Sequence, residues 1–573
     1  MTENRSQQQL YFVGLSKVIF ADEVMAVAKT GQTKTKQTIR LSLNRPTGNF
    51  WVDTGLVVLI QHFGEGEHNA QEVLEWVQGQ LLQKSGNKGE YYDPSTKQVR
   101  EYEKVNWTYP TNLFIKVSGQ PAKVPVREAL EELQERLKQL ETEGRSNTLE
   151  GKKIAESVEY LTARLAKKED DRIFTEPPTF RLSLELSKKP GACDLCGEIA
   201  PLTDAKMWMY PFIVDPQKFG TFYSGNRRGL KLCARCAIAG LAGYLGWLWK
   251  AQGRDALHFF IFHSELREMK RLHEEVLQLL MAEAAAGRGG TAPTEFAGPY
   301  IHETTLGLLL ALFAHVRQSD QLSEPARLLL AQLLGASETS VPTSSITLYA
   351  VTGTPGKAFN MQALREFSKL QRLYRLYEEW VRQISDLGID ANPHRRLVHI
   401  LGQFWAQHGQ NRETIWRDKI AQAILEFGDP LPFVEQFLFE VRAKEENRRP
   451  LLRGTLNVLN HYVREVLHMD EQFQRTLAGF GHSLGIAAQQ NNEMGLLYAL
   501  RNAKNPEEFY RVLNDVQFRL QITIPESLLR IEKGERIAGV PWVRVKTLLS
   551  IYAMNAYLRK ASAQEEETPS QEG

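Results

Sequence analysis

The clearest chemistry in this sequence belongs to its cysteines, which form two C-x-x-C motifs and occur nowhere else in the 573 residues. Cys193 and Cys196 form the first motif, and Cys233 and Cys236 form the second. Four thiolates at this spacing can complete a tetrahedral shell around one zinc ion, which leaves no ligand position open for a substrate. We therefore predict one structural Zn²⁺ site and assign no reaction to it.

The segment between the two motifs is longer than a minimal zinc ribbon needs, because 36 residues separate Cys196 from Cys233. Aromatic, amide and guanidinium groups on a loop fixed by a metal could contact RNA or DNA. The candidates in this segment are Tyr223, Asn226, Arg227 and Arg228. Packing of the same loop against a neighbouring domain or subunit is an equal alternative.

Two polar stretches near the N-terminus offer further candidates for DNA contacts. Residues 29–37 form a lysine-rich loop that includes Lys34 and Lys36, and residues 45–55 form a turn-rich segment that includes Arg45 and Asn49. Asparagine can read a base edge, and lysine can hold a phosphate. The alternative for each loop lysine is a solvated side chain with no partner.

Motifs typical of catalysis are incomplete. His302-Glu-Thr-Thr-Leu306 lacks the second histidine of a zinc protease motif, and residues 353–357 lack the spacing of a phosphate-binding loop. His258 and His263 are five residues apart, as are His394 and His399, which would place each pair on different sides of a helix. We therefore expect a protein that is not an enzyme. A hydrolase whose site is assembled from distant residues remains the alternative.

Composition places the chain among ordinary globular proteins, with 42% hydrophobic and 24% charged residues and a formal net charge of +2. The first residues are polar, and no apolar stretch is long enough to span a bilayer, so we expect a cytoplasmic protein with no membrane partner. In a reducing compartment, paired C-x-x-C motifs favour metal binding over disulfides.

These patterns predict an α+β multidomain fold, in which a mixed N-terminal domain with an inserted zinc-ribbon module precedes a mainly α-helical C-terminal bundle. Leucines at helical spacing predict a helical hairpin within residues 125–172, and a helix is expected at 361–384. Strands are expected at 11–20, 38–43 and 346–351. The expected parts are a mixed α/β region (1–124), a helical hairpin (125–172), the zinc module (173–250), a mixed continuation with a flexible linker at 284–299 (251–357), a helical bundle (358–560) and a disordered acidic tail (561–573).

The C-terminal helical region has a bias toward arginine. Residues 357–560 contain 29 Lys and Arg against 23 Asp and Glu, and 21 of the basic residues are arginine. Arginine binds phosphate through a planar fork and stacks on bases, so this bias favours a nucleic-acid surface. Solvated helix faces with salt bridges explain any single arginine equally well.

Three segments together resemble the large-subunit family of type I CRISPR Cascade complexes, most closely the subtype I-B branch. They are Gly191-Ala-Cys-Asp-Leu-Cys-Gly197, Tyr210-Pro-Phe212 and Leu230-Lys-Leu-Cys-Ala-Arg-Cys-Ala237. The segment Thr47–Gly55 is similar to a G-N-P-x-x-D-x-G box near the N-terminus of that branch, although Phe50 replaces the proline.

The resemblance implies a non-catalytic subunit of a crRNA-guided complex in antiviral defence. Such a subunit recognises the protospacer-adjacent motif in target double-stranded DNA and helps R-loop formation. It assembles with the backbone, 5′-handle-binding and small subunits, and it docks a helicase-nuclease or transposition proteins. The resemblance also implies that the C-terminal bundle is similar to the small subunit. Internal translation of a separate small subunit could start at Met469 or Met494. A stand-alone zinc-ribbon factor that binds nucleic acid is the alternative.

Overall fold

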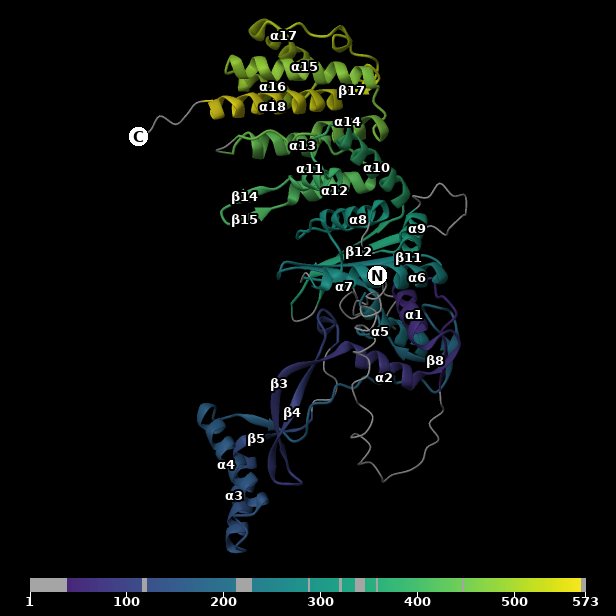
Figure 1. The fold of residues 1–573 in the computed structure, drawn as a ribbon, viewed down its shortest axis with the longest axis vertical. Coiled ribbons are helices and arrows are strands. Elements are labelled where there is room, and N and C mark those ends of the chain that lie inside the picture. The colour runs from purple at the N-terminus through teal and green to yellow at the C-terminus, as the bar shows by residue number, and fades with distance from the viewer. Residues whose placement is uncertain are drawn as a thin grey trace, which may run out of the picture. The chain divides into compact units, whose positions relative to one another are not determined.

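The structure is a computed structural model, and it describes residues 39–115, 121–212, 229–286, 289–318, 322–334, 346–356, 359–445 and 448–567. The described residues form a mixed α/β structure with several small sheets (Figure 1). None of the described helices is long and apolar enough to cross a lipid bilayer. Several predicted features lie outside these residues, namely the strand at 11–20, Lys34, Lys36, Tyr223, Asn226, Arg227 and Arg228.

Two helices from distant parts of the chain, α1 (Phe50–Phe63) and α5 (Ala234–Gly246), pack against each other, and their backbones approach closely at Gly55. Glycine permits this approach, because a Cβ atom at Gly55 would lie 1.7 Å from the carbonyl oxygen of Ala239. The helix α1 begins inside the segment 45–55 that was expected to be turn-rich, so only its first residues form a turn. The strands β1 (Arg40–Ser42) and β2 (Glu67–Asn69) pair before α2 (Ala70–Leu81).

An antiparallel sheet follows, with the strand order β10 (Leu248–Gln252), β11 (Ala256–His263), β12 (Thr347–Thr354) and β13 (Asn360–Phe367). His258 and His263 therefore lie on a strand, which corrects the prediction of a helix for this pair. The helix predicted at 361–384 is also partly wrong, because β13 occupies its first residues and α10 begins only at Leu370. Pairing with β12 overrides the helical propensity of this segment.

The glycine- and proline-rich segment 284–299 is not a free linker. The helix α7 (Gln278–Ala286) covers its first residues, after α6 (Leu266–Leu272) and a π-helical stretch (His273–Leu277). Beyond it, the amides of Thr291 and Ala292 both donate to the carbonyl oxygen of Trp249 at 2.9 Å, and Ala292 is fully buried. Small residues allow this part of the chain to pass close to β10. A Cβ atom at Gly290, for example, would collide with the carbonyl oxygen of Trp249.

The segment predicted as a helical hairpin contains two helices, α3 (Val126–Thr142) and α4 (Leu149–Lys167), which pack on each other. They join a second sheet with the order β4 (Gln98–Trp107), β3 (Leu82–Asp93), β6 (Arg172–Phe174) and β5 (Lys123–Pro125). Leu133, Ile154 and Leu161 are fully buried in the small core that joins helices and sheet. The long β3–β4 ribbon has no counterpart in the prediction.

The C-terminal part is mainly helical, and one cluster of buried hydrophobic side chains extends from Leu248 in β10 to Leu558 in α18. This core crosses the expected boundary at residues 357 and 358, so the sheet and the helices share it. Two small hairpins interrupt the helices, β14 (Ala406–His408) with β15 (Asn411–Glu413) and β16 (Arg536–Ile537) with β17 (Val540–Pro541). The final helix continues to Glu567, so the first residues of the tail expected at 561–573 are helical.

The bounds of the remaining helices are as follows: η1 (Thr111–Leu113), α8 (Ile301–Arg317), α9 (Glu324–Leu333), α10 (Leu370–Asp386), α11 (Pro393–Gly402), α12 (Ile415–Glu426), α13 (Leu431–Phe437), a π-helical stretch (Leu438–Arg442), α14 (Thr455–Glu465), α15 (Glu471–Gln490), α16 (Met494–Asn502), α17 (Pro506–Leu520), η5 (Glu526–Leu528) and α18 (Trp542–Glu567).

Candidate metal centre

The first cysteine motif lies in a tight turn between two short strands, β7 (Pro190–Ala192) and β8 (Ile199–Asp204). The amide of Gly197 donates to the carbonyl oxygen of Cys193 at 2.9 Å, and Gly197 has a φ of +72° that glycine adopts without strain. The amide of Cys193 in turn donates to the Glu198 carbonyl at 2.9 Å. These bonds fold the chain back so that both thiols of the motif face the same side.

The second motif lies where β9 (Lys231–Cys233) leads into α5. Cys233 is the N-cap of this helix, and its Sγ accepts a hydrogen bond from the amide of Cys236 at 3.5 Å. The Sγ of Cys193 accepts one from the amide of Cys233 at 3.3 Å. Because a helix N-terminus carries partial positive charge, these thiols lie where thiolates are stabilised.

The four sulfur atoms form one compact cluster, as the sequence predicted. All four lie within 4.8 Å of one another, and the Sγ atoms of Cys196 and Cys233 are 3.7 Å apart. A zinc–sulfur bond of about 2.3 Å places the sulfurs of a tetrahedral site about 3.8 Å apart, so the cluster has the dimensions of such a shell. Among the residues that the structure describes, this is the one group of three or more His, Cys, Asp or Glu side chains with metal-binding geometry.

The thiols also share protons in a way that favours a cation. Hydrogen bonds from Cys233 and Cys236 lower the pKa of Cys193. The bond to Cys193 raises the pKa of Cys233 to about 12, and bonds to Cys193 and Cys233 raise the pKa of Cys236. Because zinc binds cysteine as the thiolate, a bound divalent cation would release the protons of these thiols.

Arg235, which the sequence analysis did not select, balances the charge of this cluster. Burial lowers the pKa of its guanidinium, but the hydrogen bond to Cys196 and the nearby charges of Cys236 and Glu198 raise the pKa above its usual value. The side chain is 5% exposed, and one of its nitrogens lies 3.2 Å from Glu198. A single arginine between the cysteines of the second motif was the only signal for this role.

Arg235 also connects the centre to the N-terminal candidates, because it donates to the backbone carbonyl of Arg45 at 3.1 Å. The side chain of Arg45 is exposed. Asn49 is the N-cap of α1, where its Oδ1 accepts from the amides of Trp51 and Val52 at 3.1 Å. Both residues therefore lie at the edge of the metal module, and Asn49 has a structural role there in addition to the predicted contact with DNA.

The segment that follows the first motif packs on the start of α1. Asn49 Nδ2 donates to the hydroxyl of Tyr210 at 3.3 Å, and the ring of Trp51 meets Phe212 edge to face with centroids 5.5 Å apart. The indole nitrogen of Trp51 donates to the carbonyl of Gly240 in α5 at 2.8 Å. The Thr47–Gly55 segment thus contacts both the Tyr210–Phe212 segment and α5, the helix in which the second cysteine motif ends.

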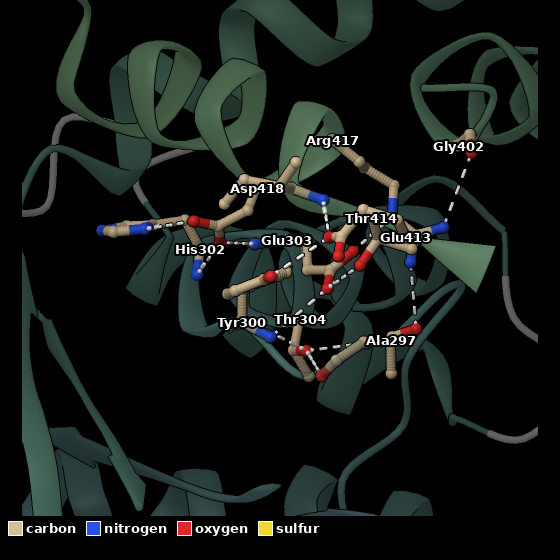
Figure 2. Close-up of polar contacts among 12 residues, drawn as sticks. Ala297, Tyr300, His302, Glu303, Thr304, Gly402, Glu413, Thr414, Arg417 and Asp418 are labelled. Carbon is tan, nitrogen blue, oxygen red and sulfur yellow. Dashed lines mark hydrogen bonds and ion pairs between the residues drawn. The ribbon is translucent and has the colours of Figure 1, made fainter. Parts of the chain in front are cut away.

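The near miss His302-Glu-Thr-Thr-Leu306 has a different role, which Figure 2 shows. The segment begins α8, and Glu303 is fully buried, where it forms an ion pair with Arg417 of α12 at 2.5 Å. Asp418 accepts hydrogen bonds from the amides of His302 and Glu303 at 2.9 and 3.0 Å. These residues join two helices through a buried polar network, and sequence spacing alone gave no sign of the partners on α12.

No protein-family model matches this chain, and no curated protein matches it.

Proposed function

We propose that this protein is the non-catalytic large subunit of a crRNA-guided type I-B Cascade complex and that it works in the cytoplasm. In this role it recognises the protospacer-adjacent motif in duplex DNA and helps to open the duplex beside the guide RNA. It then docks the helicase-nuclease or the transposition machinery. Base pairing reads the long target, while the protein reads only a short motif and the backbone.

One observation supports this proposal most directly. The segments that carry the resemblance are far apart in the sequence, but the Asn49 side chain contacts Tyr210, and the Trp51 side chain contacts Gly240 of α5, the helix that starts after Cys233. Unrelated fragments with chance similarity have no reason to meet in this way. These contacts fit a single module, in which the segment after the first cysteine motif packs on the start of α1.

The metal in this proposal is Zn²⁺, held by Cys193, Cys196, Cys233 and Cys236. Its four sulfur ligands fill the tetrahedral shell, so it supplies stability and shape but no reactive position. The protein residues around it do the positioning. Arg235 fixes the backbone at Arg45, and the aromatic contacts of Trp51 fix the start of α1, so the predicted DNA contacts at Arg45 and Asn49 are presented by a rigid support.

The test is co-expression of the chain with a type I-B guide RNA and the other Cascade subunits from the same gene neighbourhood. We expect the chain to co-purify with the guide RNA and to contain one zinc ion by elemental analysis. A zinc-free chain that does not associate with the guide complex would refute the proposal. Binding of DNA by the chain without a guide would support the stand-alone factor instead. DNA hydrolysis that survives loss of the cysteines would support the hydrolase.

The contribution of Asn49 to DNA recognition can be separated from its role as a helix cap. Asn49→Asp keeps an oxygen that caps α1 but removes the amide donor, whereas Asn49→Ala removes both. We expect both variants of the assembled complex to lose affinity for target duplex, and only Asn49→Ala to lose thermal stability as well. Normal DNA affinity of the Asp variant would restrict Asn49 to capping.

A further inference from the structure

The β14–β15 hairpin is a short, fully polar projection on the helical part of the chain. The register pairs Gln407 with Arg412 and His408 with Asn411, which leaves Gly409 and Gln410 as a two-residue turn. Gly409 has a φ of +60°, as a tight hairpin turn requires. All residues from 407 to 412 are exposed, and none of residues 403–412 is acidic.

One face of the hairpin is held in place by a cation–π contact. The guanidinium of Arg412 lies 4.5 Å from the ring centre of Trp405, and Gln407 is directly opposite Arg412 across the hairpin. His408 and Asn411 form the next pair and face the other side, because side chains alternate along a strand. The projection therefore presents amides and an imidazole beside a guanidinium that packs on Trp405, and the side-chain amide of Gln407 donates to the carbonyl oxygen of Gly409 at 2.5 Å.

The base of the hairpin is anchored in the buried network of Figure 2. Glu413 accepts hydrogen bonds from the Tyr300 hydroxyl at 3.1 Å and from the amide of Ile415 at 2.9 Å. The next residue, Thr414, donates to the fully buried Glu303 at 2.8 Å. On the other side, the buried side chain of Gln403 donates to Thr455 at 2.9 Å. A polar hairpin with so firm a base loses little conformational entropy when it binds a partner.

We infer that the β14–β15 hairpin binds in the major groove of duplex DNA with its tip inserted, so that the amides of Gln410 at the tip and of Gln407 and Asn411 on the two faces meet base edges. Arg412, on the same face as Gln407, then meets phosphate or guanine. A two-stranded ribbon fits the major groove of B-form DNA, and amide and guanidinium side chains pair with adenine and guanine there. The major groove of an RNA duplex is too narrow for such a ribbon. Single-stranded nucleic acid needs an open aromatic surface, but Arg412 covers Trp405. The inference rests on the proposed function in one respect, namely that the duplex is the target DNA of the complex. The hairpin would be a contact with DNA in addition to the candidates Arg45 and Asn49.

The test compares two variants with a matched control in the assembled complex and in the isolated chain. Arg412→Ala removes the cation, and the triple variant Gln407→Ala/Gln410→Ala/Asn411→Ala removes the amides. Arg382→Ala is the control, because Arg382 is also exposed and also carries one positive charge. Fluorescence anisotropy measures binding to a panel of duplex DNA sequences, to single-stranded DNA and to duplex RNA at several salt concentrations. Thermal melting establishes that all variants fold.

We expect Arg412→Ala to weaken duplex DNA binding about tenfold and to reduce the slope of log affinity against log salt by about 1. The triple variant should lose sequence preference within the panel, and Arg382→Ala should bind like the wild type. Unchanged duplex affinity in both hairpin variants would overturn the inference, as would equal losses for single strands or RNA, or a wild-type chain that binds no duplex. Co-purification with guide RNA is measured separately, so the proposed function can fail while the hairpin inference stands, and the reverse.

Discussion

Replacement of Arg417 by methionine should strongly destabilise the protein, because it leaves Glu303 buried without a cation. The Glu303 side chain is fully buried, and that of Arg417 is 11% exposed. Beyond the ion pair, Arg417 donates to the backbone carbonyls of Ala297 at 3.1 Å and Gly402 at 3.5 Å. Methionine fills a similar volume but supplies none of these donors, so the two carbonyls lose the Arg417 donor and Glu303 keeps only neutral donors such as Thr414.

The expected loss is about 3–5 kcal/mol, the usual cost of removing one partner of a buried ion pair. The double variant Glu303→Gln/Arg417→Met removes the charge as well, so we expect it to recover about 2 kcal/mol of that loss. The loss in Arg417→Met should also grow with pH. Burial raises the pKa of Glu303 above its usual 4.5 even with Arg417 present, and removal of the cation raises it further.

The sign of this pH dependence follows from proton linkage. A carboxyl with a raised pKa holds its proton more tightly in the folded state than in the unfolded state. The folded state is therefore destabilised as pH rises above the ordinary pKa of glutamate, and the effect is complete above the folded pKa. At a pH below that ordinary value, Glu303 is neutral in both states, and the cost of losing Arg417 is limited to hydrogen bonds and packing.

The measurement is urea unfolding followed by tryptophan fluorescence at about pH 5 and about pH 8. Arg382→Met is the control, since the pair of Arg382 with Glu379 is on the surface, where solvent screens it, and should contribute little to stability. The reasoning is refuted if Arg417→Met costs less than about 1 kcal/mol at the higher pH, or if Glu303→Gln in the same chain gives no recovery.

Three other outcomes follow from the structure. In thermal or urea unfolding, Gly55→Ala should lower the free energy of unfolding by about 3 kcal/mol, because its Cβ would lie 1.7 Å from the Ala239 carbonyl oxygen. The control is Gly79→Ala in α2, whose Cβ would have no atom within 4 Å, and it should be neutral or stabilising. Removal of zinc by a chelator, or Cys236→Ser, should lower the melting temperature and increase protease sensitivity around α5, and a metal-free chain with unchanged melting would contradict this. Burial raises the pKa of Glu435 to about 7, so the contribution of this group to stability should fall as pH rises from about 4.5 to above 7. Melting curves at matched pH should therefore show Glu435→Gln gaining stability relative to the wild type as pH rises through this range.

The metal centre could be predicted from the sequence because its determinants are local. Each C-x-x-C motif fixes two ligands within one turn of chain, and cysteine is rare enough here to leave no competing assignment. The helical hairpin was equally accessible, since leucines at helical spacing in α3 and α4 are the buried ones. Neither inference needed any knowledge of where distant segments lie.

Other features failed because tertiary contacts decided them. The segment of β13 contains residues that favour helices, yet it forms a strand because it pairs with β12 at the edge of the sheet. The glycines and prolines at 284–299 suggested a linker, but small residues are also what a chain needs when it passes close to a strand, as Gly290 does at Trp249. His302-Glu303 suggested a failed metal site, although its partners Arg417 and Asp418 are over a hundred residues away.

The metal centre and the start of α1 act as one structural unit, which changes how the N-terminal candidates should be understood. Cys233 caps the first turn of α5, and the carbonyl of Gly240 in α5 accepts a hydrogen bond from Trp51. Trp51 lies two residues after Asn49, and the Asn49 side chain contacts Tyr210 in the segment after the first cysteine motif. A disturbance at any cysteine therefore reaches Asn49 through two short routes. For this reason a cysteine variant that loses DNA binding says nothing about direct contact between the metal module and DNA, whereas a variant of the distant β14–β15 hairpin leaves this unit intact.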